Sequence, residues 1–136
     1  MSLQAAIVSI AAANAPLTAL IGTRIYEYGL PQSKTVPAMT FQVISQTNYK
    51  AMTPVIVDYH SRVQIDGWVQ SARSGGSTTK QALRDAIFNA YFGYSGSIGG
   101  ISIKAFLLED ERPNIEGLDT DKEMDRINMD FMVDFI

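Results

Sequence analysis

The sequence contains no cysteine and one histidine, His60. The lack of thiols excludes cysteine nucleophiles, zinc–thiolate sites and iron–sulfur clusters, and it is typical of proteins from a reducing compartment. A single histidine leaves one possible base for a serine triad, and no Gly-x-Ser-x-Gly motif accompanies it. We therefore expect His60 to be a solvated residue of a strand.

Basic residues are fewer than acidic ones. There are 11 Lys and Arg against 14 Asp and Glu, which gives a net charge of −3 and an isoelectric point near 5.0. A dedicated binder of duplex DNA normally carries a surplus of Lys and Arg, so this composition argues against that class. The charge is divided unevenly, because residues 1–108 carry a net +4 and residues 109–136 a net −7. Segments of opposite charge can attract each other between copies of one chain.

Long apolar runs are absent as well. No stretch approaches the roughly 18 apolar residues that a membrane span requires, and the first residues lack the basic region of a signal peptide. We expect a soluble cytoplasmic product with no membrane partner. The length of 136 residues favours a single domain, residues 1–136.

Hydrophobic periodicity predicts three helical or turn segments and four long strands. The helical pattern covers residues 2–13, a short turn at 17–21 and an amphipathic helix at 77–92, whereas alternation with period two marks strands at 38–49, 59–70, 101–109 and 123–135. The predicted fold is α+β. We expect an antiparallel sheet of four strands or slightly more, with an N-terminal helix and one central amphipathic helix packed on one face. Long loops are expected at about 48–58 and 112–122.

The alternation also predicts which side chains point toward the helices. In the second strand Val63, Ile65, Gly67 and Val69 share one face, and Arg62, Gln64, Asp66 and Trp68 share the other. In the third strand Ile101, Ile103, Ala105 and Leu107 are expected to point inward. In the fourth strand Ile127, Met129, Phe131, Val133 and Phe135 alternate with polar neighbours.

Three segments resemble chemical motifs without completing them. Residues 119–130 begin like a calcium loop, but Met124 stands where the loop needs glycine and Asp130 where it needs glutamate. Residues 75–80 are glycine-rich before a helix but lack the Gly-Lys-Ser/Thr core of a phosphate loop. Carboxylates gather at residues 109–112 with no nucleophile beside them. We predict no catalytic, cofactor-binding or metal-binding residues.

Several segments, in order along nearly the whole chain, resemble one protein family. They are Leu20–Tyr26 (LIGTRIY), Leu30–Gln32 (LPQ), Val36–Ala38 (VPA), Arg62–Trp68 (RVQIDGW), Leu107–Arg112 (LLEDER) and the alternating Phe131–Phe135. This order and spacing are similar to the tail-completion, or tail-terminator, family of long-tailed bacteriophages, also called tail-to-head joining proteins. None of the segments is a catalytic signature. The departures from the family pattern lie mainly in the loops.

The resemblance implies a structural virion protein rather than an enzyme. Members of this family form a ring, usually a hexamer, that caps the finished tail tube and provides the surface on which the head connector docks. The implied partners are further copies of this chain, the tail tube protein and the head connector protein. DNA would pass through the ring without specific binding, and no cofactor is implied. The implied location is the virion, with assembly in the host cytoplasm.

Under this interpretation the contact residues lie in the first long loop and in the segment that leads into the second. Met52, Val55 and Ile56 are the candidate apolar contacts with the tube or a neighbouring subunit, and Glu109, Glu111 and Arg112 are candidates for salt bridges between subunits. Two other functions stay open: another ring protein of the head–tail connector, and a small α+β ligand-binding or hydrolytic domain built on residues 109–112. The second of these would need a concave pocket holding a perturbed carboxylate.

Overall fold

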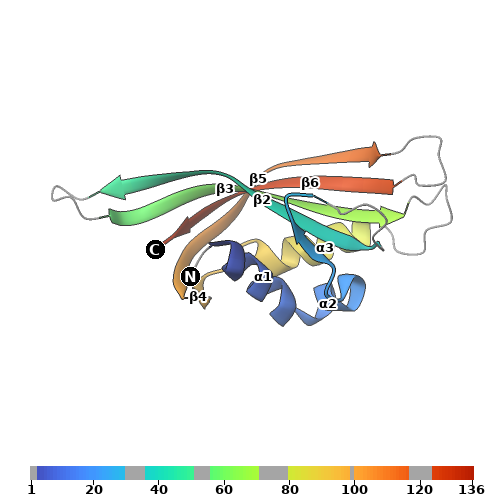
Figure 1. Ribbon diagram of the computed structural model, residues 1–136, viewed down its shortest axis with the longest axis horizontal. Helices are drawn as coiled ribbons and strands as arrows, with labels where there is room; N and C mark the ends of the chain where they lie inside the picture. The colour runs from blue at the N-terminus through green and yellow to red at the C-terminus, as the bar shows by residue number, and fades with distance from the viewer. Residues whose placement is uncertain (1–2, 30–35, 51–55, 71–79, 99, 117–123) are drawn as a thin grey trace.

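A computed structural model describes residues 3–29, 36–50, 56–70, 80–98, 100–116 and 124–136. The elements in chain order are α1 (Leu3–Ala13), α2 (Ala15–Ile21), β1 (Ile25–Glu27), β2 (Ala38–Lys50), β3 (Ile56–Gln70), α3 (Lys80–Tyr91), β4 (Gly96–Ile98), β5 (Ile101–Glu116) and β6 (Met124–Phe135). Figure 1 shows one strongly twisted sheet with all three helices beneath it.

The sheet has six strands in the order β1-β2-β3-β6-β5-β4. It is mixed, because β1 runs parallel to β2 while every other pair is antiparallel. The expected four-stranded antiparallel sheet with one central helix is therefore wrong: the sheet is larger, curled and mixed, and three helices pack on it. The four long strands lie as neighbours in the order β2-β3-β6-β5. The additional strands, β1 and β4, are three residues long, too short to show a period of two.

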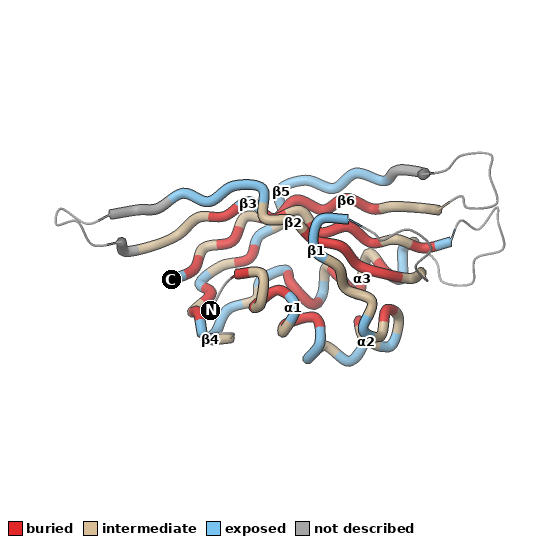
Figure 2. The backbone as a smooth tube through the Cα atoms, viewed as in Figure 1, coloured by how far each residue is buried: buried red, intermediate tan, exposed pale blue. Residues whose placement is uncertain are grey.

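The core lies between the helices and one face of the sheet. Figure 2 shows buried residues along the sides of α1 and α3 that face the sheet and along the middle of the strands. The buried helix residues recur at helical spacing, and they are Leu3, Ala6, Ile7, Ile10 and Ala11 in α1 and Leu83, Ala86, Ile87, Ala90 and Tyr91 in α3. Tyr91 joins the two helices, since its hydroxyl donates a hydrogen bond of 2.7 Å to the carbonyl of Ile7.

The predicted faces of β3 and β6 are confirmed. Val63, Ile65, Gly67 and Val69 are all buried toward the helices, and so are the alternate residues from Ile127 to Phe135. In β5 the prediction is correct for Ile101 and Ile103 and wrong for Ala105 and Leu107, which pair with Asp134 and Met132 on the other face; Leu107 is 51% exposed. A bulge between Ile103 and Ala105 adds one residue to β5. Because an extra residue reverses the alternation, Phe106 takes the buried place.

The strands extend into the ranges assigned to the two long loops. β2 continues to Lys50 and β3 begins at Ile56, while β5 continues to Glu116 and β6 begins at Met124. The sheet is therefore longer than the alternation indicated, and its two long hairpins project at opposite ends of the molecule (Figure 1). Residues 51–55 and 117–123 lie outside the described residues.

Within the described ranges, no single helix is both long enough and apolar enough to span a membrane. The pair α1 and α2, bent by 92°, meets the length and composition only when taken together.

Gly67 sets how closely α3 approaches β3. A Cβ atom placed there would lie 3.0 Å from Ile87 Cδ1, 3.0 Å from Leu83 Cδ2 and 3.2 Å from Leu83 Cγ. These distances are shorter than ordinary van der Waals contact, so a side chain at this position requires the Leu83 and Ile87 side chains to give way by a few tenths of an ångström.

We predict that Gly67→Ala lowers the free energy of unfolding by about 1 kcal/mol, because overpacking outweighs the gain from a stiffer unfolded chain. Chemical denaturation monitored by circular dichroism measures the change. Gly29→Ala is the matched control, since a Cβ there meets no atom within 4 Å, and its effect should stay within about 0.5 kcal/mol. Equal effects of the two substitutions would contradict this account of the packing.

Candidate functional site

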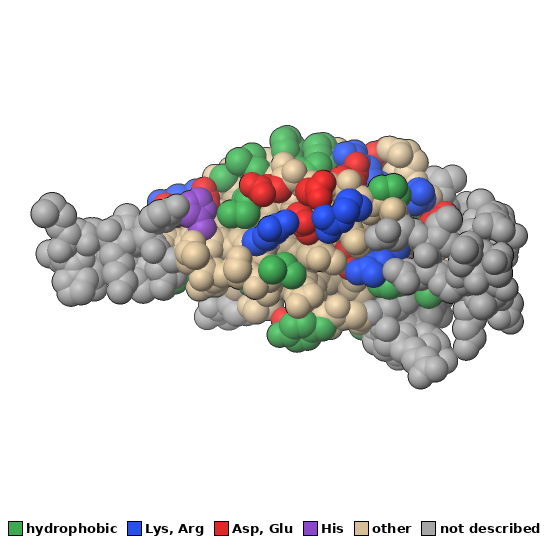
Figure 3. Space-filling view, turned by 90° about the horizontal axis from the view of Figure 1, so that it is seen from above, with side chains coloured by type: hydrophobic (Ala, Val, Ile, Leu, Met, Phe, Trp, Pro, Cys, Tyr) green, Lys and Arg blue, Asp and Glu red, His purple; other side chains and the backbone are tan. Residues whose placement is uncertain are grey.

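The face of the sheet opposite the helices carries a strip of charged and polar side chains. Figure 3 views this face from above and shows acidic and basic side chains gathered at its middle, with His60 toward one end. The strip crosses β2, β3, β6 and β5, because the residues that alternate with the core positions come into register there. We call it the polar face, made up of Thr40, Arg62, Gln64, Asp66, Trp68, Asp110, Arg112, Arg126, Asn128 and Asp130.

Asp66 is the centre of one half of the polar face. Its Oδ2 accepts a hydrogen bond of 2.9 Å from Arg126 Nη2, and Gln64 Nε2 lies 3.1–3.2 Å from both carboxylate oxygens. The side chain is 7% exposed although no helix covers it. Burial raises the pKa of the Asp66 carboxyl above its ordinary value of 3.8; Arg126 and Gln64 oppose this rise, and the nearby charge of Asp130 adds to it.

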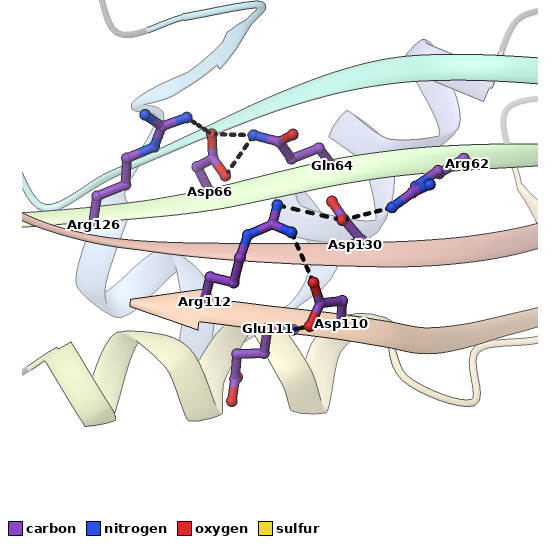
Figure 4. A network of polar contacts seen from close by, with 8 residues as sticks. All are labelled: Arg62, Gln64, Asp66, Asp110, Glu111, Arg112, Arg126 and Asp130. Atoms are coloured by element: carbon purple, nitrogen blue, oxygen red, sulfur yellow. Dashed lines mark hydrogen bonds and ion pairs between the residues drawn. The ribbon is translucent and has the colours of Figure 1, made fainter. Parts of the chain in front are cut away.

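Asp130 is the centre of the other half, shown in Figure 4. Its Oδ2 lies 3.0 Å from Arg62 Nη2 and 3.5 Å from Arg112 Nη2, and its side chain is 4% exposed. Arg112 also donates to Asp110 Oδ2 at 2.7 Å. A chain of ion pairs thus runs from β3 through β6 to β5, and it satisfies a carboxylate that would otherwise be buried without a partner.

Trp68 extends the polar face toward β2. Its indole Nε1 donates a hydrogen bond of 2.9 Å to Thr40 Oγ1, and the Arg126 guanidinium lies 4.8 Å from the ring centroid. The contact is within the range of a cation–π interaction. Arg126 therefore holds an indole ring and a carboxylate at once.

The predicted contact residues lie in different situations. Met52 and Val55 are outside the described residues, and Ile56 opens β3, where only its backbone is described. Glu109, Glu111 and Arg112 are exposed residues of β5. Glu111 pairs with Arg84 of α3, with Arg84 Nε 2.5 Å from Glu111 Oε1, and Arg112 pairs with Asp110 and Asp130. Both side chains are thus engaged inside the subunit, and their role between subunits stays a prediction.

His60 lies next to Asp134 across β3 and β6. Its Nδ1 contacts Asp134 Oδ1, and the two side chains are about 30% exposed. The histidine is thus partly solvated, as expected, but it is paired with a carboxylate that the sequence alone did not assign to it.

Residues 119–123 of the segment that resembles a calcium loop lie outside the described residues, and its remainder, 124–130, belongs to β6; of the segment that resembles a phosphate loop, residues 75–79 lie outside them and Lys80 begins α3. Among the residues that the structure does describe, no group of three or more His, Asp and Glu side chains is arranged to hold a metal ion. A pocket of about 180 Å³ lies between the start of α3 and β5, lined by Lys80, Gln81, Arg84, Glu111, Pro113 and Ile127. It is smaller than a usual small-molecule site, and its one carboxylate is held by Arg84.

The fold is similar to that of a solved chain. That chain comes from a structure described as "Virion of native gene transfer agent (GTA) particle"; the TM-score is 0.67 and the sequence identity 20%, and the match covers 98% of this chain and 94% of the other. No family model matches the sequence, and no curated protein matches it. At this identity the likeness concerns the fold alone.

The two ion pairs of Arg112 differ in burial, which gives a matched test of the polar face. We predict that Asp130→Asn lowers the free energy of unfolding by about 1.5–3 kcal/mol, because it removes the buried negative charge that pairs with Arg62 and Arg112. Asp110→Asn should cost less than about 1 kcal/mol, since its partner side chain and its own are both half exposed. Thermal and urea unfolding measure both variants, and a larger loss for Asp110→Asn would refute the assignment.

The pKa of Asp66 gives a pH-dependent test. Because the pKa in the folded chain lies above the unfolded value, protonation favours the folded state. The contribution of Asp66 to stability is full below the unfolded pKa and is lost as the pH rises through the folded pKa. We expect an NMR titration of the Asp66 carboxyl carbon to show a midpoint above 3.8, with Asp66→Asn identifying the signal. A midpoint below that value would contradict the dominant effect of burial.

Proposed function

We propose that this protein is a structural component of a phage-type virion, and within that class a tail terminator. In this role copies of the chain form a ring, six in number by the usual pattern of the family, that caps the tail tube and offers the docking surface for the head connector. The proposed location is the virion, after assembly in the host cytoplasm.

The observation that carries this proposal is the whole-chain likeness to a chain of a gene transfer agent virion. A match over 98% of one chain and 94% of the other relates the complete subunits rather than a shared motif. The description of that structure names a virion particle and no position within it. The assignment to the tail end therefore depends on the resemblance to the tail-completion family.

The segments that carry this resemblance occupy structural positions in the fold. The segment Leu20–Tyr26 links α2 to β1, and Arg24 at its middle donates hydrogen bonds to the carbonyls of Pro37 (2.7 Å) and Leu20 (3.1 Å). Arg62–Trp68 forms the centre of β3, and Leu107–Arg112 the centre of β5. These positions support a shared fold, because the segments in β3 and β5 both pair with β6 and Arg24 ties the turn after α2 to the residue before β2.

The proposed partners are other copies of this chain, the tube protein below and the head connector above. The lumen of the ring would let DNA pass without gripping it, which agrees with the small acidic net charge. The proposed role requires neither catalysis, nor a cofactor, nor a membrane.

A stop codon at Gln4 in the parent genome tests the role. We expect filled heads and separate tails, with tubes of irregular length, in electron micrographs of the lysate. A synonymous change at Gln4 and complementation from a plasmid are the controls, and both should restore joined particles.

The other outcomes of this experiment are equally informative. Tails of normal length that still fail to join heads would indicate another ring of the head–tail connector instead. Normal, joined particles would refute a role in the virion.

A further inference from the structure

The sheet has one open edge on β2. On this side β1 pairs with Met39–Phe41, and the last bond to the edge among the described residues is the one of 2.7 Å that the Tyr28 amide donates to the Phe41 carbonyl. From Gln42 to Lys50 β2 pairs with β3 alone, and no described backbone group bonds its outer side. Residues 44–47 are exposed along this edge, as Figure 2 shows.

The second open edge belongs to β5. There β4 covers Ile101–Ile103, and the Gly93 amide donates a hydrogen bond of 2.8 Å to the Phe106 carbonyl. From Leu107 to Glu116 β5 pairs only with β6 among the described strands. The two open edges are similar in length and lie on different strands. Long open edges in native proteins are normally blunted or paired with another chain.

We propose that the open edge of β2 in one copy pairs with the open edge of β5 in the next copy, so that one sheet continues from subunit to subunit. This inference rests on the proposed ring, and it identifies the contact that would build the ring. Because the four long strands alternate in direction from β2 to β5, copies related by rotation about the ring axis meet there as antiparallel strands. Two different edges make a head-to-tail contact, the kind that closes into rings.

The alternation of the strands predicts the register. Thr47 and Asp110 both belong to the polar-face side of their strands, and Gln46 and Glu111 both belong to the helix side. Pairing Thr47 with Asp110 of the next copy therefore keeps both faces continuous. It also places Gln46 opposite Glu111 and Ser45 opposite Arg112.

This register implies a strand tilt that suits a closed barrel. Within one subunit Ser45 pairs with Arg62, Arg62 with Met132, and Met132 with Leu107. Ser45 and Leu107 therefore lie at the same height along the strands. If Ser45 pairs with Arg112 of the next copy, the position at the same height on β6 moves from Met132 to Asn128. This is a displacement of about 14 Å along the strand. Over four strand spacings, about 19 Å, the shift corresponds to a tilt of about 35°, which lies in the range of closed β-barrels.

The side chains on the two edges favour this pairing over its alternatives. Ile44 on β2 is 46% exposed and Leu107 on β5 is 51% exposed, so each edge offers a large apolar side chain for burial. Pairing β5 with β5 would place the acidic run 109–111 against itself, at a cost in charge repulsion. Pairing β2 with β2 would leave the β5 edge open in every copy. Pairing β2 with β5 avoids both problems, because residues 42–47 of β2 are uncharged and both edges become paired.

The absence of native cysteine allows a direct cross-linking test. Thr47→Cys and Asp110→Cys are made as single variants, mixed at high protein concentration and oxidised. We expect covalent dimers from the mixture and none from either variant alone, because the contact is head-to-tail. A chain carrying both substitutions should give a ladder of covalent oligomers that ends at the size of the ring. Asn89→Cys, on the exposed side of α3, replaces Asp110→Cys in the control mixture, which should stay monomeric.

Three results would overturn the pairing. They are self-dimers of Thr47→Cys, mixed dimers no more abundant than in the Asn89→Cys control, and a wild-type chain that stays monomeric at about millimolar concentration. Rings seen by negative-stain microscopy without the Thr47–Asp110 cross-link would reject this contact and leave the proposed ring intact. Normal particles from the stop-codon genome would instead reject the role at the tail, whatever the cross-links show.

Discussion

One constraint governs this fold: its single sheet has helices on only one face. Burial of the apolar side chains of β3, β6, α1 and α3 stabilises that face. Gly67, which has no side chain, lets α3 pack closely against β3. The other face must satisfy its own polar groups, which it does by pairing Asp66 and Asp130 with three arginines. Among the described residues, the edges of β2 and β5 beyond β1 and β4 are unpaired, and in the proposed ring they pair with each other between neighbouring copies.

Much of the sheet could be predicted because alternation is a local property. The inward faces of β3 and β6 followed directly from residues such as Val63, Ile65 and Phe131. Leu107 was misplaced because one extra residue at the bulge near Ala105 reverses the alternation, and no pattern in the sequence marks that bulge. The strands β1 and β4 are three residues long, too short for a pattern of alternation, so the sequence could not reveal the parallel pairing of β1 with β2 or the short hairpin of β4 with β5.

The polar face was harder to foresee, because it depends on which strands are neighbours. Asp66 was correctly assigned to the polar side of β3, but its partner Arg126 is 60 residues away on β6. The one available signal was opposite charge at matching positions of two predicted strands. The sequence marks Glu111 and Arg112 as candidate contact residues, yet their partners within the subunit depend on the packing of α3 and on the register of β5 with β6.

These features combine into the central proposal that the subunit is a segment of a larger closed sheet at the end of a virion tail. Cryo-electron microscopy of the head–tail junction of the parent particle tests it most directly. We predict that this chain forms a ring at the head-proximal end of the tail tube, with β2 of each copy beside β5 of the next. A junction that lacks the chain, or a ring whose subunits meet through their helices with both sheet edges open, would contradict the claim.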